Sequence, residues 1–450
     1  MKSLNKINPA GKITISFIVV ILIGAFLLCL PISSKDGLWF PFIDSIFTAT
    51  SAVCVTGLIV VDTAVHFSLF GQIVIMLLIQ IGGLGFITIS SLVFVLLGKK
   101  LSYKSRLTIQ ESLNQDNNEG ILKLVKEVII LVFSCEFVGF ICLLPSFINM
   151  YGVGQGVFTA MFLSISAFCN AGFDVIGTQS TMFQNLEPLR ENVFIILPIV
   201  LLIILGGIGH IVIFEIIRKQ KNKKLSLHSK IVLISTMALI IGGTILFALM
   251  EWNNPNTIGE LNTFNKILNS LFQSVTPRTA GFSTINQGNL TAGSIILTDL
   301  LMFIGGSPGS IAGGVKTTTI FVLILVVFKG TNSKGDVVYK NKKISNSTIL
   351  KSLRVFSLAI VFIICSVFAI TIIENGAFTL SEILFEVISA ISTVGISLGI
   401  TTSLSIGSKI IISMLMFVGR VGTLTITMAI SKNKDENKEI EYLDSKIMVG

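Results

Sequence analysis

Long apolar runs, separated by short polar segments, dominate the chain. The first run covers residues 13–30 and stops at Pro31. The other runs cover residues 70–97, 124–147, 192–217, 231–250, 295–328, 353–373 and 408–430. A helix needs about 20 apolar residues to cross the roughly 30 Å hydrocarbon core of a bilayer. The pattern therefore predicts an all-α polytopic membrane protein with eight spanning helices.

The eight runs form pairs, and a related short stretch lies between the two members of each pair. The four stretches are FTATSAVCVTGL (47–58), FLSISAFCNAGF (162–173), LFQSVTPRTAGF (271–282) and FEVISAISTVGI (385–396). Their glycines, Gly57, Gly172, Gly281 and Gly395, are separated by 115, 109 and 114 positions. A fixed long period is typical of a repeat architecture. The sequence therefore predicts four copies of one unit.

Each unit is expected to contain a span, a helix too short to span, an extended re-entrant segment and a second span. In the first unit the short helix is predicted over about residues 42–53, followed by the extended VTGLIVVDT. The four units are assigned to residues 1–115, 116–225, 226–345 and 346–435, with a tail at 436–450. The second span of the third unit departs from the others, because LMFIGGSPGSIAGGVKTTT (301–319) is rich in glycine and contains Pro308.

Composition agrees with this class, since only 13% of the 450 residues are charged and the mean hydropathy is +0.87. A soluble domain carries roughly 25% charged residues. The positions of the Lys and Arg residues predict the topology. Of 33, 26 lie in residues 1–12, 98–126, 218–230, 329–354 and the tail. Five lie on the opposite side: Lys35, Arg190, Lys266, Arg278 and Lys409. We therefore expect both termini in the cytoplasm and a net charge that reflects topology, not a nucleic-acid partner.

The reactive side chains do not suggest an enzyme. All six cysteines lie in apolar runs without a CxxC pair, and the three histidines, His66, His210 and His228, are scattered. This distribution argues against a metal site, a disulfide framework or a catalytic pair. The first 12 residues are basic and polar, and the run after them is interpreted as a retained span, not a cleaved signal.

The four extended segments suggest a function. Irregular backbone at membrane depth is tolerated where it is buried in protein or lines a water-filled cavity. Four such segments around a common axis would present carbonyl oxygens and the partially negative C-terminal ends of four helices. Rings of carbonyl oxygens can replace the hydration shell of a cation. This arrangement predicts selective conduction of a dehydrated monovalent cation, whereas the competing interpretation treats the glycines only as helix-packing points.

The motifs also support a specific resemblance. TSAVCVTGL, SAFCNAGF, TPRTAGF and STVGI, together with GGSPGSIAGGVKTT and GRVGTLT, occur in order over about residues 10–430. The chain resembles the Ktr/Trk/HKT superfamily of potassium transporters, in particular its KtrB-type membrane subunits. The resemblance implies that backbone carbonyls of twelve residues bind K⁺ in a selectivity filter. These residues are Val55, Thr56, Gly57, Asn170, Ala171, Gly172, Thr279, Ala280, Gly281, Thr393, Val394 and Gly395.

Two details bear on ion preference. Some members of the superfamily carry Ser at the position of Gly57 and admit sodium, so Gly57 implies a preference for potassium. Only the fourth segment, with Thr393, Val394 and Gly395, resembles the TVG of potassium channels.

The glycine-rich stretch in the third unit is expected to act as a gate. It does not match a P-loop, because Gly309 does not give the required spacing to Lys316. By resemblance, the gate comprises Gly305, Gly306, Ser307, Pro308, Gly309, Ser310, Gly313, Gly314, Lys316, Thr317 and Arg420. A charge such as Arg420 in mid-membrane costs about 2.5–3.5 kcal/mol on insertion scales. The alternative for Arg420 is a structural ion pair with Glu136 or Glu215.

The glycines of the second spans, two aspartates and one histidine lie near the predicted filter or the second spans. The glycines of the remaining second spans are expected to be close-packing points: Gly82, Gly83, Gly85, Gly206, Gly207, Gly209, Gly419 and Gly422. Asp62 and Asp174, just beyond their glycines, are interpreted either as cation-concentrating groups or as solvated loop acids. His210 is interpreted as a buried histidine with a hydrogen-bond partner.

The resemblance also implies partners and a location. The chain is expected in the plasma membrane as a homodimer, with residues 447–450 in the dimer interface. A separate cytoplasmic ring of RCK-type, KtrA- or KtrC-like subunits would bind nucleotide and dock on the basic loops 99–106, 218–230 and 329–343. No cofactor is expected in this chain, and sodium coupling is possible. The alternative within transport is a secondary monovalent cation carrier with alternating access.

Overall fold

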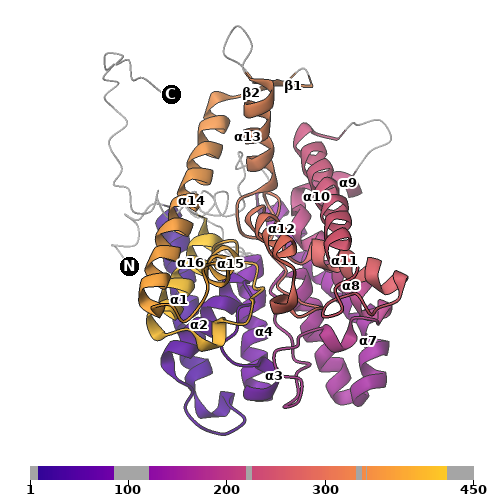
Figure 1. Cartoon of the computed structure of the whole chain (residues 1–450), viewed down its shortest axis with the longest axis vertical. Coiled ribbons are helices and arrows are strands. Elements are labelled where there is room, and N and C mark those ends of the chain that lie inside the picture. The colour runs from indigo at the N-terminus through magenta and orange to yellow at the C-terminus, as the bar shows by residue number, and fades with distance from the viewer. Residues whose placement is uncertain (1–8, 86–120, 219–224, 331–336, 341, 423–450) are drawn as a thin grey trace.

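The computed structural model describes residues 9–85, 121–218, 225–330, 337–340 and 342–422, and these are mostly helical (Figure 1). The first half contains α1 (Pro9–Cys29), α2 (Phe42–Cys54), α3 (Thr63–His66), α4 (Leu69–Leu84), α7 (Ile121–Phe168), α8 (Val193–Ile208) and α9 (His210–Ile217). The second half contains α10 (Leu227–Glu251), α11 (Thr263–Val275), α12 (Ala292–Phe303), α13 (Thr317–Lys329), α14 (Asn346–Glu374), α15 (Leu380–Ile391) and α16 (Ile406–Val421). A two-stranded antiparallel hairpin, β1 (Val337–Tyr339) and β2 (Lys342–Ile344), lies beside α13.

Long apolar helices begin each predicted unit. Four helices of the described residues are long and apolar enough to cross a membrane: Gly11–Cys29, Lys123–Phe168, Leu227–Glu251 and Asn346–Glu374. The bent pair α8 and α9 counts as a fifth span if the two helices are taken together. α4 and α16 end at the edges of described stretches, so the prediction of eight spans extends outside the described residues. The observed helices establish a helical membrane protein.

A short helix follows each long one and packs against it. These short helices are α2, the end of α7, α11 and α15, and α7 is divided by Gly152, whose φ of 78° is not helical. Local sequence sets several of the starts. Asn262 accepts a hydrogen bond from the backbone of Asn265, and Thr379 and Glu382 form a capping box at the start of α15. Buried aromatic side chains such as Phe47 and Phe385 fill the core around these helices.

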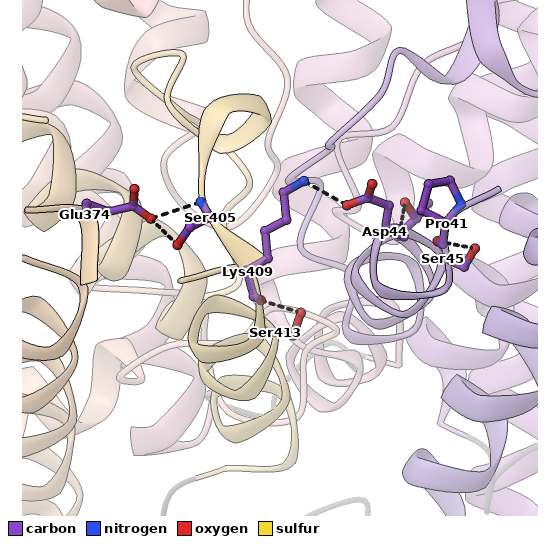
Figure 2. A network of polar contacts seen from close by, with 8 residues as sticks. Pro41, Asp44, Ser45, Glu374, Ser405, Lys409 and Ser413 are labelled. Atoms are coloured by element: carbon purple, nitrogen blue, oxygen red, sulfur yellow. Dashed lines mark hydrogen bonds and ion pairs between the residues drawn. The ribbon is translucent and has the colours of Figure 1, made fainter. Parts of the chain in front are cut away.

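The first and last parts of the described chain are in contact, and neighbouring helices connect the parts between them. α4 contacts α7, α8 contacts α11, and α12 contacts α15. α16 then contacts α2, and in Figure 1 the indigo and yellow parts of the chain lie side by side. At this junction the Nζ atom of Lys409 donates to Oδ1 of Asp44 at 2.8 Å (Figure 2). Glu374 accepts from both the backbone and the hydroxyl of Ser405, which fixes the start of α16 (Figure 2).

The second helices differ from the continuous spans expected. The predicted span 192–217 is two helices that meet at 100°, because Gly209, with φ of 102°, ends the first one. α4 ends at Gly85 and α16 ends at Gly422, each with a positive φ. α12 and α13 are separated by residues 304–316, which we call the glycine loop. Interruption is therefore a property of more than one unit, and the expectation of a continuous helix over 192–217 is wrong.

Candidate functional site

Four three-residue stretches share one backbone conformation, and we call them the glycine segments: 55–57, 170–172, 279–281 and 393–395. In each segment the first and third residues have a positive φ and the middle residue does not. The first residues are Val55, Asn170, Thr279 and Thr393, with φ of 56°, 57°, 73° and 50°. A positive φ is an outlier for a β-branched residue, and such strain is kept where the surroundings enforce it. The common pattern shows that the segments occupy equivalent environments.

Each glycine of the segments lies against the segment of the next unit. An added Cβ at Gly57 would be 2.6 Å from the carbonyl oxygen of Ala171, and one at Gly172 would be 2.9 Å from that of Ala280. At Gly281 it would be 2.6 Å from the oxygen of Val394, and at Gly395 it would overlap the oxygen of Thr56. The fourth contact returns to the first unit. The carbonyls of Thr56, Ala171, Ala280 and Val394 therefore form a closed ring that admits no side chain at the glycines.

Hydroxyl groups of the short helices hold the segments from behind. Ser51 and Ser389 accept hydrogen bonds from the backbone nitrogens of Gly57 and Gly395 at 3.0 and 3.1 Å. Ser166 donates to the carbonyl of Phe173 at 2.7 Å. Sequence reasoning missed these residues, although each serine stands six positions before its glycine and the spacing is a signal that could have found them.

The glycine loop lies on the inner side of the segments, where inner and outer refer to the predicted topology. The backbone nitrogens of Ser307 and Ile311 donate to the carbonyls of Gly207 and Gly206 at 3.0 and 3.3 Å. Nδ1 of His210 lies 2.8 Å from the carbonyl oxygen of Gly309, which confirms the predicted hydrogen-bond partner, although the histidine is half-buried and not buried. These contacts connect the loop of the third unit to the helix break of the second.

The loop also reaches the other two units. An added Cβ at Gly313 would overlap the side chain of Thr393, and one at Gly314 would be 3.3 Å from Cβ of Ser392. An added Cβ at Gly83 would be 3.6 Å from Cγ2 of Ile311. Within the loop, Gly305 bonds to the carbonyl of Val315, and Lys316 donates to the carbonyls of Ala312 and Gly313. Residues 305–317, which the sequence predicts as a gate, thus contact residues of the other three predicted units.

Arg420 joins three elements at this level. Its Nη1 donates to the carbonyl of Ile311 in the glycine loop, and its Nη2 donates to the carbonyls of Gly82 and Gly83 at the end of α4. The suggested acidic partners are engaged elsewhere. Gln80 donates to Glu136 at 3.0 Å, and Glu215 accepts from Ser226 and Ser229 at the start of α10. Among the described residues the alternative of a structural ion pair is therefore not found.

Arg420 occupies the place of a glycine in the other units. An added Cβ at Gly82, Gly206 or Gly419 would overlap a carbonyl at the end of a short helix. The carbonyls are those of Val53, Phe168 and Ile391, each four positions before the segment glycine. Gly83 and Gly207 follow the first two of these glycines, and Arg420 follows the third. These contacts support the close-packing interpretation of the glycines and single out Arg420 within the set.

Three charged residues near the glycine segments have hydrogen-bond partners within the protein. Arg278, assigned to the outer side, is buried at the inner end of α11, where Nη2 lies 3.4 Å from Oγ1 of Thr236 in the middle of α10. Asp62 is buried and accepts hydrogen bonds from the backbone nitrogens of Val65 and Phe183. Asp174 accepts from the backbone of Ile176 and from Asn185. The burial of Asp62 contradicts its interpretation as a solvated acid, whereas Asp174 is half-buried and hydrogen-bonded to the protein.

Comparisons with known proteins agree with this geometry. A family profile described as "TrkH: Cation transport protein" matches residues 5–442. The chain is 39% identical to the Ktr system potassium uptake protein B of Bacillus subtilis, over 99% of this chain and 97% of the relative. It is 37% identical to the potassium/sodium uptake protein NtpJ of Enterococcus hirae, over 99% and 98%. A third relative, the Ktr system potassium uptake protein B of Vibrio alginolyticus, is 36% identical over 97% and 94%.

A solved structure shares the fold. The crystal structure of the potassium transporter TrkH from Vibrio parahaemolyticus aligns with a TM-score of 0.69, at 16% identity, over 92% of this chain and 84% of that one. At this identity the likeness concerns the fold alone, whereas the relatives match at higher identity over almost the whole chain. The chain belongs to the TrkH family of cation transport proteins.

Proposed function

We propose that the chain is the ion-translocating subunit of a Ktr-type potassium uptake system and conducts K⁺ through one pore on the axis of the glycine segments. The observation that carries the proposal is the closed ring of the carbonyls of Thr56, Ala171, Ala280 and Val394. Carbonyl oxygens in a ring replace the hydration shell of a cation. The names of the full-length relatives, which include potassium uptake, support the choice of ion.

The twelve residues of the glycine segments form the proposed selectivity filter. The four short helices end at the segments, so their partially negative C-terminal ends favour a cation there. Gly57 supports potassium over sodium, whereas the name of the Enterococcus hirae relative includes both ions. Sodium dependence is therefore an outcome that the uptake experiment below distinguishes.

The glycine loop and Arg420 form the proposed gate. The loop lies across the inner side of the ring, and Arg420 bonds it to α4 through the carbonyls of Ile311, Gly82 and Gly83. A guanidinium charge at this level opposes a cation leaving the filter. Opening then requires that Arg420 release the carbonyl of Ile311.

The finer architecture belongs to the same proposal. Four units at 1–115, 116–225, 226–345 and 346–435 would supply eight spans around the pore, with both termini cytoplasmic and the chain in the cell membrane. The contact of α16 with α2 supports a ring of four units. The proposed partners are a second copy of this chain and a cytoplasmic nucleotide-binding RCK ring. The tail 436–450 and the basic loop 99–106 lie outside the described residues.

Uptake measurements in cells without other potassium transporters test the function. Cells that express the chain with its cytoplasmic partner ring are compared with cells that carry Gly281→Asp, using K⁺, Rb⁺ and Na⁺. We expect the wild type to restore growth on low potassium. The Gly281→Asp variant should fail to restore growth, because a side chain at Gly281 meets the carbonyl of Val394.

Gly376→Asp is the matched control. Gly376 has a φ of 86° against 79° at Gly281, and an added Cβ there meets nothing within 4 Å. It therefore reproduces the backbone strain without blocking the ring. If wild type restores no potassium uptake even with the partner ring, the proposed function is wrong. If the wild type restores sodium uptake alone, the proposed pore is retained, but the preference for potassium inferred from Gly57 is wrong.

A further inference from the structure

One amide side chain outside the glycine segments connects the second of them to the chain just beyond the third. Nδ2 of Asn185, in the outer loop of the second unit, donates to the carbonyl of Gly172 at 3.2 Å and to Oδ2 of Asp174 at 2.7 Å. Oδ1 of the same side chain accepts from the backbone nitrogens of Leu186 and Ser283 at 3.0 and 3.2 Å. Ser283 follows Gly281 by two positions. Asn185 therefore bonds to the second segment and to the chain two positions beyond the third.

The partners fix the orientation of the amide. Nδ2 faces a carbonyl and a carboxylate, which only accept, and Oδ1 faces two backbone nitrogens, which only donate. The backbone also favours asparagine, because Asn185 has a φ of 50°, a conformation in which Asn is enriched among non-glycine residues. Both the side chain and the main chain thus require this residue type.

The hydrogen bond makes the second glycine segment different from the others. In the described parts of the chain, no side chain donates to the carbonyl of Gly57, Gly281 or Gly395. A carbonyl oxygen has two lone pairs, so the bond from Asn185 fixes the direction of the Gly172 carbonyl and leaves one lone pair free. The same outer loop is held to the first unit, since Phe183 donates to Asp62 at 2.9 Å. The loop therefore connects the outer ends of three units.

We infer that Asn185 is a positioning residue for ion selectivity, which holds in place the Gly172 carbonyl, one residue beyond the Ala171 carbonyl of the ring. The inference rests on the proposed function. Selectivity between K⁺ and Na⁺ depends on the size of the carbonyl cage or on the number and field strength of its dipoles. A carbonyl that is free to rotate changes both quantities. Loss of the amide should therefore alter ion preference more than it alters folding.

Two substitutions separate the amide from the backbone. Asn185→Gly keeps the left-handed backbone and removes the side chain. Asn185→Asp keeps the shape but places a second carboxylate against Asp174 and the Gly172 carbonyl, all of which are acceptors. The control is Asn375→Gly, since Asn375 has a φ of 46° and caps the exposed end of α14. The measurement is the ratio of K⁺ to Na⁺ uptake in the cells above, with the amount of monodisperse protein after extraction as the folding readout.

We expect Asn185→Gly to lower the K⁺-to-Na⁺ ratio by about fivefold, the factor that corresponds to one typical hydrogen bond. Asn185→Asp should lower it further, and Asn375→Gly should leave it at the wild-type value. An unchanged ratio in well-folded Asn185→Gly would overturn the inference. A loss of folded protein in both Asn185 variants would also overturn it, because the residue would then be required for folding and not specifically for selectivity. Failure of the proposed function is a separate result, because it appears in the wild type itself.

Discussion

The glycine segments and the second helices on their inner side differ in how strictly the units repeat. At the glycine segments all four units have the same two positive φ angles, and each glycine contacts the carbonyl of the next unit. At the ends of the second helices, the third unit diverges from the other three. α4, α8 and α16 end at glycines with a positive φ, namely Gly85, Gly209 and Gly422, whereas α12 opens into the glycine loop. The ring is uniform and the layer beneath it is not.

Contact between the units explains the uniform ring. Because each segment fits into its neighbour, a change in one unit would have to be matched in the next, and a proposed filter needs equivalent oxygens around one ion. The inner layer has no such requirement, since the loop contacts each unit through different atoms. It carries Arg420 in one unit only, where Gly83 and Gly207 stand in two others. Four guanidinium groups at this level would repel one another in a low-dielectric site.

A substitution in the ring is expected to have the largest effect. Gly395→Ala should abolish selective uptake, because its Cβ overlaps the carbonyl of Thr56 and its φ of 92° costs about 1–3 kcal/mol for a residue other than glycine. Rb⁺ uptake in whole cells provides the measurement. Gly376→Ala, with a φ of 86° and open space around it, should transport normally. Selective uptake in Gly395→Ala would show that the ring tolerates asymmetry.

A substitution in the inner layer should change flux and leave ion preference intact. Arg420→Gln should raise K⁺ flux about tenfold in proteoliposomes without the partner ring, since a lost charge-assisted hydrogen bond contributes about 1.5–3 kcal/mol. Arg218→Gln is the control, because Arg218 forms an exposed ion pair with Glu127 away from the loop. Unchanged flux with a lower melting temperature would assign Arg420 a structural role. A changed K⁺-to-Na⁺ ratio would show that the two layers are not independent.

The junction of the first and last units should give the smallest effect. Asp44→Lys or Lys409→Asp alone should lower the free energy of unfolding by about 1 kcal/mol or slightly more, because the pair is partly exposed, at 13% for the Lys409 and 22% for the Asp44 side chain. The double swap should recover part of the loss. Thermal unfolding in detergent checks this coupling. If the double variant is no more stable than the less stable single variant, the ion pair between Lys409 and Asp44 does not stabilise the junction.

Much of the site could be predicted from the sequence because it is repeated. Gly57, Gly172, Gly281 and Gly395 recur at a nearly fixed spacing after similar apolar stretches, so the period alone identified them. The glycine loop could be predicted because its many glycines and Pro308 interrupt an apolar run. The lengths of the runs predicted the membrane helices α1, α10 and α14 closely. These features depend on local composition and spacing, which a sequence displays directly.

Other features depended on which groups meet in space. The bend at Gly209 could not be predicted, because the apolar run continues through this residue. The length of an apolar run indicates that a segment lies in lipid but not the direction of its helix axis. Arg278 was predicted on the outer side from its position in the sequence, which does not reveal that it bonds to Thr236. Asn185 gave no signal, because its partners Gly172 and Ser283 lie 13 and 98 positions away. The repeats and their apolar lengths were determined by the sequence alone, whereas hydrogen-bond partners were decided by the tertiary structure, because a polar group bonds to whatever donor or acceptor the fold brings within about 3 Å.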